Sequence, residues 1–251
     1  MIINKDQVLA ERPTKTIFRD GTTVVKLFDK SFSKANVLNE TLNQARVEET
    51  GLNIPKILEV MTIDGCWAFR AEYIPGKTLQ QLMEENPEKI DEYFDLFVDL
   101  QIEMHGCTCP NLNKLRDKMH GKIEQTGLDA TTRYELHTRL DSLPKRTSVL
   151  HGDFDPSNVI ISDEGKPYIL DWSHAVQGDP AADVARTYLM FWLAKREDLG
   201  EKYLKLYCKK TDTAMQHVQK WMPIIAASQS IKRKDEEKEL LHSWINVVEY
   251  E

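Results

Sequence analysis

The most informative stretch of the chain is residues 151–158, which read His-Gly-Asp-Phe-Asp-Pro-Ser-Asn. It places Asp153 and Asn158 five positions apart on a predicted loop, because Gly and Pro favour turns. The apolar runs that follow, separated by one Gly-containing turn, predict a β-hairpin over residues 159–170. Asp171 ends this hairpin, so folding back brings Asp171 beside Asn158 and Asp153. We therefore expect the side-chain oxygens of Asp153, Asn158 and Asp171 to lie close together at the end of this hairpin.

Phosphoryl transfer requires a set of groups of this kind. One carboxylate orients the attacking hydroxyl and accepts its proton, while hard oxygen ligands hold the Mg²⁺ that neutralises the nucleotide phosphates. A strand lysine held by a helix glutamate would supply further positive charge. Lys26, in a predicted strand, and Glu40, in a predicted helix, occur in that order. The residues therefore favour phosphotransfer chemistry.

The pattern of the chain changes near residue 75. Before that point β-branched and aromatic runs alternate with turn signals, and residues 17–28 predict a hairpin around an Asp-Gly turn. Beyond it, helical periodicity dominates. We expect a β-rich nucleotide-binding lobe over residues 1–75 and a helical catalytic and substrate lobe over residues 76–251.

One helix is predicted in the β-rich part, over residues 33–50, with Ser33 as its cap and Gly51 as its stop. Its apolar and polar residues form two flanks, and we expect both to be covered. The flanks are Leu38, Leu42 and Ala45 on one side, and Val37, Glu40, Gln44 and Val47 on the other.

Several motifs carry a family resemblance. The specific ones are residues 151–158, Ile-Leu-Asp-Trp at 169–172 and Gly-Asp-Pro-Ala-Ala-Asp at 178–183. Weaker ones, supported by their order and spacing, are Val-Lys at 25–26, Glu40, the stretch 51–55 and Glu-Tyr-Ile-Pro-Gly at 72–76. Together they resemble the aminoglycoside phosphotransferase and choline kinase superfamily, the small-molecule relatives of protein kinases. The resemblance spans most of the chain.

The resemblance implies a two-lobed, protein-kinase-like α+β fold, with a small antiparallel β-sheet lobe that has one main helix and a larger, mostly helical lobe. It also implies transfer of the γ-phosphoryl group of ATP or GTP to a hydroxyl of a small molecule, with Mg²⁺ as cofactor. His-Gly-Asp stands where protein kinases have His-Arg-Asp, and Trp-Ser follows Asp171 in place of Phe-Gly. Both departures point away from protein substrates.

The same resemblance implies roles for single residues. Asp153 is expected to be the catalytic base, and Asn158 and Asp171 are expected to bind Mg²⁺. Lys26 is expected to touch the nucleotide phosphates, with Glu40 positioning it.

Further residues complete the expected site. His151 and Asp183 are expected to support the catalytic loop. The expected contacts to the nucleotide base are the side chains of Val24 and Ile160 and the backbone of Glu72, Tyr73 and Ile74.

The loop expected near residues 11–16 lacks the glycine that many relatives have there for backbone approach to phosphates. Arg12 and Lys15 could contact phosphate through their side chains instead. The choice between ATP and GTP therefore stays open, and so does a catalytically silent nucleotide-binding regulator.

The composition limits the partners. The chain has 251 residues, and its 40 acidic residues exceed its 33 basic ones, giving a net charge of −7. This balance argues against a nucleic-acid-binding face and mildly favours cationic or metal-bound partners, so the small-molecule acceptor could be cationic. The polar N-terminus and the shortness of the apolar runs predict a cytoplasmic protein without a membrane partner. The oligomeric state is left open.

Two features of the last third of the chain bear on the acceptor. Acidic residues could attract a polycationic aminoglycoside, or could be a solvated helix face: Asp235, Glu236, Glu237, Glu239, Glu249 and Glu251. Aromatic residues could form a cation–π box for choline, although at helical spacing they are more often core: Trp192, Trp221, Trp244, Tyr203, Tyr207 and Tyr250. A sugar and an amino alcohol are further options.

Overall fold

The computed structural model describes residues 7–232 and 234–246. Their contacts divide the chain into two compact units. The first takes the described residues up to Pro87 together with residues 156–175, and the second takes residues 88–155 and the described residues from 176 onward. These units have other bounds than the predicted lobes 1–75 and 76–251, because residues 156–175 form strands that pair in the first unit. The assignment of separate functions to the two lobes stays a prediction.

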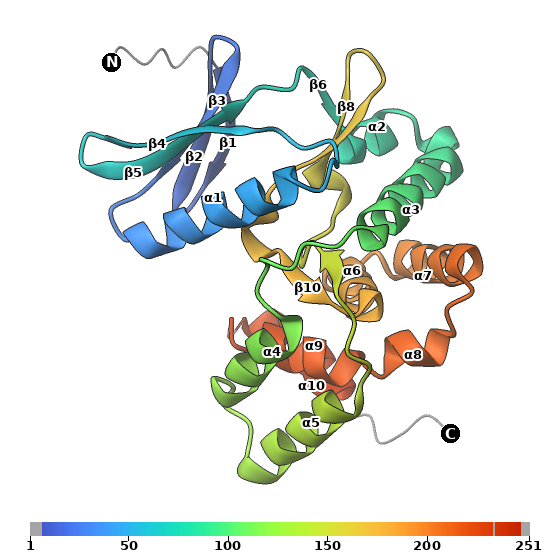
Figure 1. Cartoon of the computed structure of the whole chain (residues 1–251). Coiled ribbons are helices and arrows are strands. Elements are labelled where there is room, and N and C mark those ends of the chain that lie inside the picture. The colour runs from blue at the N-terminus through green and yellow to red at the C-terminus, as the bar shows by residue number, and fades with distance from the viewer. Residues whose placement is uncertain (1–6, 233, 247–251) are drawn as a thin grey trace. The chain divides into compact units, whose positions relative to one another are not determined.

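A five-stranded antiparallel sheet makes up much of the first unit, in the order β1-β2-β3-β5-β4 (Figure 1). The predicted hairpin is confirmed, since Asp20 of β2 pairs with Thr23 of β3. Gly21, in the turn between them, has a φ of +61°, which glycine adopts without strain. The strands are β1 (Gln7–Arg12), β2 (Lys15–Asp20), β3 (Thr23–Phe28), β4 (Ile57–Ile63) and β5 (Cys66–Glu72).

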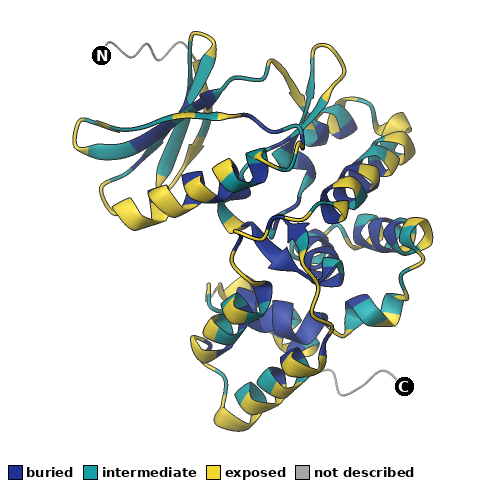
Figure 2. Ribbon diagram, in the orientation of Figure 1, coloured by how far each residue is buried: buried dark blue, intermediate teal, exposed yellow. Residues whose placement is uncertain are grey.

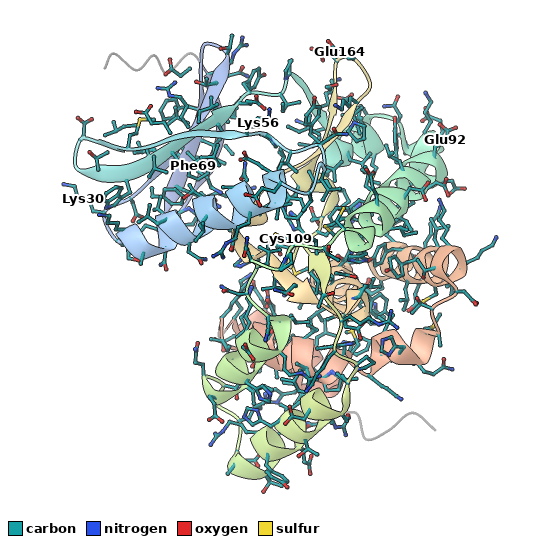
Figure 3. The ribbon with its side chains drawn as sticks, in the orientation of Figure 1. Lys30, Lys56, Phe69, Glu92, Cys109 and Glu164 are labelled. Atoms are coloured by element: carbon teal, nitrogen blue, oxygen red, sulfur yellow. The ribbon has the colours of Figure 1, made fainter. Side chains whose placement is uncertain are left out.

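Helix α1 (Lys34–Glu48) packs on one face of this sheet (Figure 1). Its predicted cap is confirmed, because the Ser33 hydroxyl accepts a hydrogen bond from the Asn36 backbone N–H at 3.2 Å. Val37 packs with Phe28 and with Phe69, the latter labelled in Figure 3 between the sheet and the helix. The helix is thus held to the sheet by a small apolar cluster.

The prediction that both flanks of α1 are covered is wrong for one flank. Leu38 and Leu42 are 41% and 48% exposed, while Glu40 and Gln44 are buried. The helix packs against the sheet on its other side, so the flank with Glu40 and Gln44 is turned inward and the two leucines remain exposed. Figure 2 shows α1 as exposed on the side that faces away from the sheet. The helix therefore buries Glu40 and leaves Leu38 and Leu42 exposed.

A second, three-stranded sheet completes the first unit, in the order β6-β8-β9. Gly76 of β6 pairs with Ser162 of β8, and a Cβ at residue 76 would lie 2.2 Å from the backbone oxygen of Ile161. Only glycine fits this close approach. The elements are β6 (Gly76–Thr78), β8 (Val159–Ser162), β9 (Pro167–Ile169), helix α2 (Leu79–Glu85) and 3₁₀ turns at Pro156–Asn158 and Trp172–His174.

The second unit is mostly helical. Helix α9 is buried along almost its whole length (Figure 2), and short strands β7 (Ser148–Leu150) and β10 (Val176–Gly178) pair antiparallel. The helices are α3 (Ile90–Gly106), α4 (Leu115–Glu124), α5 (Ala130–Ser142), α6 (Pro180–Leu193), α7 (Glu197–Thr211), α8 (Met215–Gln219), α9 (Met222–Ser230) and α10 (Asp235–Ile245). None of the helices in the described residues is long and apolar enough to cross a membrane. The predicted α+β class is confirmed.

Candidate active site

A buried ion pair in the first unit joins Lys26 of β3 to Glu40 of α1. The two residues are only 6% and 5% exposed. The Lys26 ammonium also lies 3.3 Å from Oδ1 of Asp171. Burial alone would lower the pKa of Lys26, but the carboxylates of Asp171 and Glu40 outweigh it and raise this pKa above its ordinary value. Lys26 is therefore held as a cation beside a carboxylate.

A second lysine reaches the same carboxylate. The Lys15 ammonium, at the start of β2, lies 3.3 Å from Oδ2 of Asp171. Burial, together with the neighbouring Lys26, lowers the pKa of Lys15 although Asp171 opposes this. The connection between β1 and β2 is only Pro13 and Thr14. The glycine-free stretch thus forms a tight turn that ends in an inward-reaching lysine.

Asn158 lies directly before β8 and Asp171 lies two residues after β9, so the pairing of these strands brings the two residues to the same end of the hairpin, as the sequence predicts. Val159 pairs with Ile169, and the Leu170 N–H donates a 2.8 Å hydrogen bond to the Asn158 carbonyl. Asp171 adopts the left-handed conformation, with φ 58° and ψ 65°. Aspartate tolerates this region better than most residues, and strained backbone of this kind clusters at functional sites.

The residues present fit Mg²⁺. Asn158 and Asp171 offer an amide and a carboxylate oxygen, the ligand types that this ion prefers. In the part of the chain that the structure describes, no three His, Cys, Asp or Glu residues are grouped as a metal site. A set with one carboxylate suits Mg²⁺, which commonly takes one or two carboxylates and completes its shell with water and phosphate oxygens.

The five residues predicted to contact the nucleotide base all lie in the first unit, and all are half-buried. Val24 packs against the cluster around Phe28. The Glu72 N–H donates to the Lys56 carbonyl at 3.0 Å, and the Tyr73 N–H donates to the Thr22 carbonyl at 3.3 Å. These two N–H groups are therefore used within the protein, which removes them from the expected backbone contacts to a base.

Asp153 lies in the second unit, on a loop that Asp183 holds. The buried Asp183 carboxylate accepts hydrogen bonds from the backbone N–H groups of His151 at 3.1 Å and Gly152 at 2.7 Å. The His151 ring nitrogen Nδ1 in turn accepts from the Asp153 N–H at 3.2 Å. The pKa of Asp183 would rise through burial, but the hydrogen bond and charge of His105 hold it below its ordinary value. The loop is thus fixed around an ionised carboxylate.

Sequence reasoning missed Arg186. Its Nη2 lies 3.3 Å from Oδ1 of Asp153, and its Nη1 donates to Oε1 of Gln229 on α9 at 2.7 Å. Arg186 follows Asp183 by three positions on α6, so the two side chains share a helix face. That spacing is the signal that could have found it.

The aromatic residues considered for a choline box are largely core. Tyr203, Tyr207 and Trp221 are at most 3% exposed. Trp192 and Trp244 are half-buried and pack edge to face, with ring centroids 5.6 Å apart. The remaining candidates, Tyr250 and the acids Glu249 and Glu251, lie outside the described residues.

The predicted residues thus form two sets. The first unit brings together Lys26, Glu40, Asn158 and Asp171, with Lys15 added. The second unit brings together His151, Asp153 and Asp183, with Arg186 added. That Asp153 meets Asn158 and Asp171 around one ion stays a prediction.

Comparison with known proteins identifies the family. The model of the phosphotransferase enzyme family matches residues 14–221. The chain belongs to this family. No curated protein sequence matches it, but solved structures of other phosphotransferases resemble it in fold.

One of them is a thermostable mutant of aminoglycoside phosphotransferase APH(4)-Ia in a ternary complex with ADP and hygromycin B, with a TM-score of 0.67, 16% identity and coverage of 95% of this chain and 89% of that one. Another is the choline kinase LicA from Streptococcus pneumoniae, with a TM-score of 0.61, 18% identity and coverage of 95% and 86%. A third is aminoglycoside-3'-phosphotransferase of type VIII, with a TM-score of 0.63, 14% identity and coverage of 92% of both chains. The kinase-like fold and the resemblance noted in the sequence are confirmed, and the family is one of small-molecule phosphotransferases.

Proposed function

We propose that the protein transfers the γ-phosphoryl group of ATP or GTP to a hydroxyl of a small molecule. The observation that carries this proposal is the buried Lys26–Glu40 ion pair beside Asp171, in a chain of the phosphotransferase family. A lysine whose charge is fixed in this way can bind phosphate oxygens without reorganising. The ADP complex of a fold neighbour supports a nucleotide co-substrate.

Each of the candidate site residues in the first unit has a proposed role. Lys26 binds the phosphates and Glu40 orients it. Asn158 and Asp171 hold Mg²⁺, which when bound neutralises the charge of the phosphate oxygens. Lys15 takes over the phosphate contacts that a glycine-rich loop would make through its backbone.

The half-buried side chains of Val24 and Ile160 line the nucleotide base in this proposal. Since the N–H groups of Glu72 and Tyr73 donate within the protein, the backbone contacts fall to the Glu72 carbonyl and the Ile74 N–H. These atoms would select between adenine and guanine, because the two bases differ in their donors and acceptors.

Asp153 is the proposed general base. It orients the acceptor hydroxyl and accepts its proton, a task that contributes roughly 10² to 10⁴ in rate. Asp183 and His151 hold the loop by accepting hydrogen bonds from its backbone N–H groups, and Arg186 fixes the Asp153 carboxylate through Oδ1. The small acceptor is thus brought to a preset carboxylate.

The test is a coupled assay of nucleoside diphosphate formation with Asp153→Asn. We expect kcat to fall by about 10² to 10⁴ while Mg²⁺-nucleotide binding stays intact. The matched control is Asp163→Asn, in the exposed turn between β8 and β9, which should keep wild-type kcat. Equal turnover in Asp153→Asn would remove the base assignment.

A nucleotide-binding regulator without activity is the second candidate, and the two-residue turn before Lys15 favours it, since no glycine backbone is there to approach phosphates. Binding of Mg²⁺-nucleotide without turnover across aminoglycosides, choline, sugars and amino alcohols would support it. Turnover of any acceptor would exclude it.

A further inference from the structure

A series of side-chain hydrogen bonds in the second unit runs from α10 to the carboxylate of Asp153. The Lys234 ammonium donates to Oε1 of Glu237 at 2.9 Å, and Nε2 of Gln229 donates to Oε2 of Glu237 at 2.7 Å. Arg186 completes the series, since its Nη1 donates to Oε1 of Gln229 at 2.7 Å and its Nη2 lies 3.3 Å from Oδ1 of Asp153. We call Glu237, Gln229 and Arg186 the polar bridge.

The polar bridge lies in the interior of the second unit. Gln229 is 2% exposed and Glu237 is 8% exposed, and the side chain of Arg186 is 12% exposed. The three residues belong to α9, α10 and α6, and α9 packs against both of the other helices. A hydrogen bond between buried groups is costly to break, because each group would be left without a partner away from water. The bridge therefore has a fixed place between the three helices.

The donors and acceptors of the polar bridge fit together in one orientation only. An ionised carboxylate only accepts and a guanidinium only donates, so the Gln229 amide turns its NH₂ group to Glu237 and its carbonyl to Arg186. Burial would raise the pKa of Glu237, but the hydrogen bonds from Lys234 and Gln229 hold it below its ordinary value. Glu237 thus stays ionised and fixes the direction of the amide.

Arg186 is the member of the polar bridge that reaches Asp153. Its guanidinium group is planar, so a contact that fixes Nη1 on Gln229 also fixes the direction of Nη2. Nη2 faces Oδ1 of Asp153. A general base must lie within hydrogen-bond reach of the hydroxyl that it deprotonates, and a small displacement lowers the rate. The orientation of Gln229 is therefore transmitted to the carboxylate of Asp153.

Glu237 is one of the acids that the sequence offers as a site for a cationic acceptor. The structure places it differently, because Glu237 is buried and both of its carboxylate oxygens accept hydrogen bonds from Gln229 and Lys234. An acid used in this way supports its own fold. Its connection to Asp153 through two further side chains gives that support a consequence for the chemistry.

We propose, on the premise of the phosphotransferase function above, that Gln229 and Glu237 are positioning residues for Asp153 and act on it through Arg186. Neither residue touches the acceptor or the nucleotide in this proposal. Their contribution should appear in kcat and not in the nucleotide KM, because the orientation of the base matters when the hydroxyl loses its proton. Helix α10 is then a support of the active site and not an acceptor-binding surface.

The first test is a double-mutant cycle in the coupled diphosphate assay, with hygromycin B, choline, ribose and ethanolamine as acceptors. Gln229→Met keeps the length of the side chain and removes the amide. We expect kcat to fall about tenfold with an unchanged nucleotide KM, while Gln216→Met on the exposed side of α8 keeps wild-type kcat. In the Arg186→Met background the same change should cause no further loss, because Gln229 acts through Arg186.

A purely structural role of Gln229 would lower the free energy of unfolding and leave the kcat of the folded protein unchanged. Denaturant unfolding of each variant therefore accompanies the kinetics. If Arg186→Met does not fold, Arg186→Lys takes its place in the cycle, since an ammonium group lacks the planar fork that holds both partners.

Glu237→Gln tests the orientation of the amide. The new side chain can donate or accept, so it no longer dictates which way the Gln229 amide turns. We expect kcat to fall about threefold with an unchanged acceptor KM. The matched control is Glu197→Gln, which lies in the first turn of α7 as Glu237 lies in that of α10, and is exposed. A raised KM for choline or hygromycin B at wild-type kcat would show instead that Glu237 binds a cationic acceptor, and would overturn the proposal.

A second measurement does not depend on turnover. Heteronuclear NMR of the arginine side chains in the full chain reports the rotation of the Arg186 guanidinium group about its Nε–Cζ bond, with Arg186→Lys for assignment. We expect slow rotation in wild type and in Gln216→Met, and faster rotation in Gln229→Met. Equal rotation in wild type and Gln229→Met would overturn the proposal, because the amide would then not hold the guanidinium.

The outcomes separate the two proposals. Turnover by wild type together with unchanged kcat in Gln229→Met, or with losses that add in the double variant, overturns the positioning role while the phosphotransferase function stands. No turnover of any of the four acceptors by wild type overturns the phosphotransferase function instead, and the role in its chemistry proposed for Gln229 and Glu237 falls with it even if the NMR measurement shows a fixed Arg186.

Discussion

The two units hold their charges in different ways. In the first, Lys15 and Lys26 face Asp171 and Glu40, so two cations meet two carboxylates and the group is neutral without a ligand. In the second, Arg186 lies beside Asp153, while burial and neighbouring cations lower the pKa of Lys118, Lys122 and Lys232. The first arrangement fixes a lysine beside a carboxylate, whereas the second keeps three ammonium groups in surroundings that disfavour their charge.

The largest effect that tests this contrast is expected from Lys26→Met. The change leaves Glu40 buried without its cation, which should lower the free energy of unfolding by about 3–5 kcal/mol. Denaturant unfolding measures it, and Lys30→Met, on the exposed turn after β3, is the control. A loss below about 1 kcal/mol would mean that Glu40 does not depend on Lys26.

The opposite sign is expected from Lys118→Met in the second unit. The folded protein holds the pKa of this ammonium at about 8 instead of 10.5. Below pH 8 the charged ammonium therefore destabilises the folded state, and a neutral side chain removes this destabilisation. The variant should be more stable by about 1–3 kcal/mol at pH 7, allowing for partial exposure.

The pH dependence gives a second check on Lys118. Between pH 8 and 10.5 the folded wild type has released this proton while the unfolded chain keeps it. Wild-type stability should therefore rise with pH over that range relative to Lys118→Met, and the gap should close. A destabilised variant at pH 7 would contradict the lowered pKa of Lys118.

The smallest effect is expected from Lys15→Ala. Loss of one partly exposed phosphate contact should raise the nucleotide KM about tenfold with little change in kcat. Steady-state kinetics at saturating acceptor measure it. A lower KM would show instead that Lys15 competes with Mg²⁺ for Asp171.

The sequence predicted the parts of the site that local pattern controls. Asn158 and Asp171 are joined by a hairpin whose strands and turn have clear signals, and the order of Lys26 and Glu40 follows from a strand and a capped helix. The same reasoning did not predict which flank of α1 is buried. Hydrophobicity favoured Leu38 and Leu42, but the helix turns Glu40 and Gln44 inward, where Glu40 pairs with Lys26 and Gln44 donates a hydrogen bond to the Pro55 carbonyl.

The approach of Lys118, Lys122, Arg186 and Lys232 to one another could not be predicted in the same way. No periodicity links segments so far apart in the chain. Only packing of α4 and α6 on α9 brings them together.

Gly76 gives the first unit an unexpected vulnerability. Strand β6 lies against β8 only because residue 76 has no side chain, and β8 begins directly after Asn158 and pairs with the strand that leads to Asp171. A methyl group at residue 76 would push that register apart and shift Asn158 and Asp171, the two proposed Mg²⁺ ligands, although it touches neither. A substitution at residue 76 that lowers activity would therefore look like the loss of a catalytic residue. Its cause would instead be a steric clash in the β6–β8 strand pair.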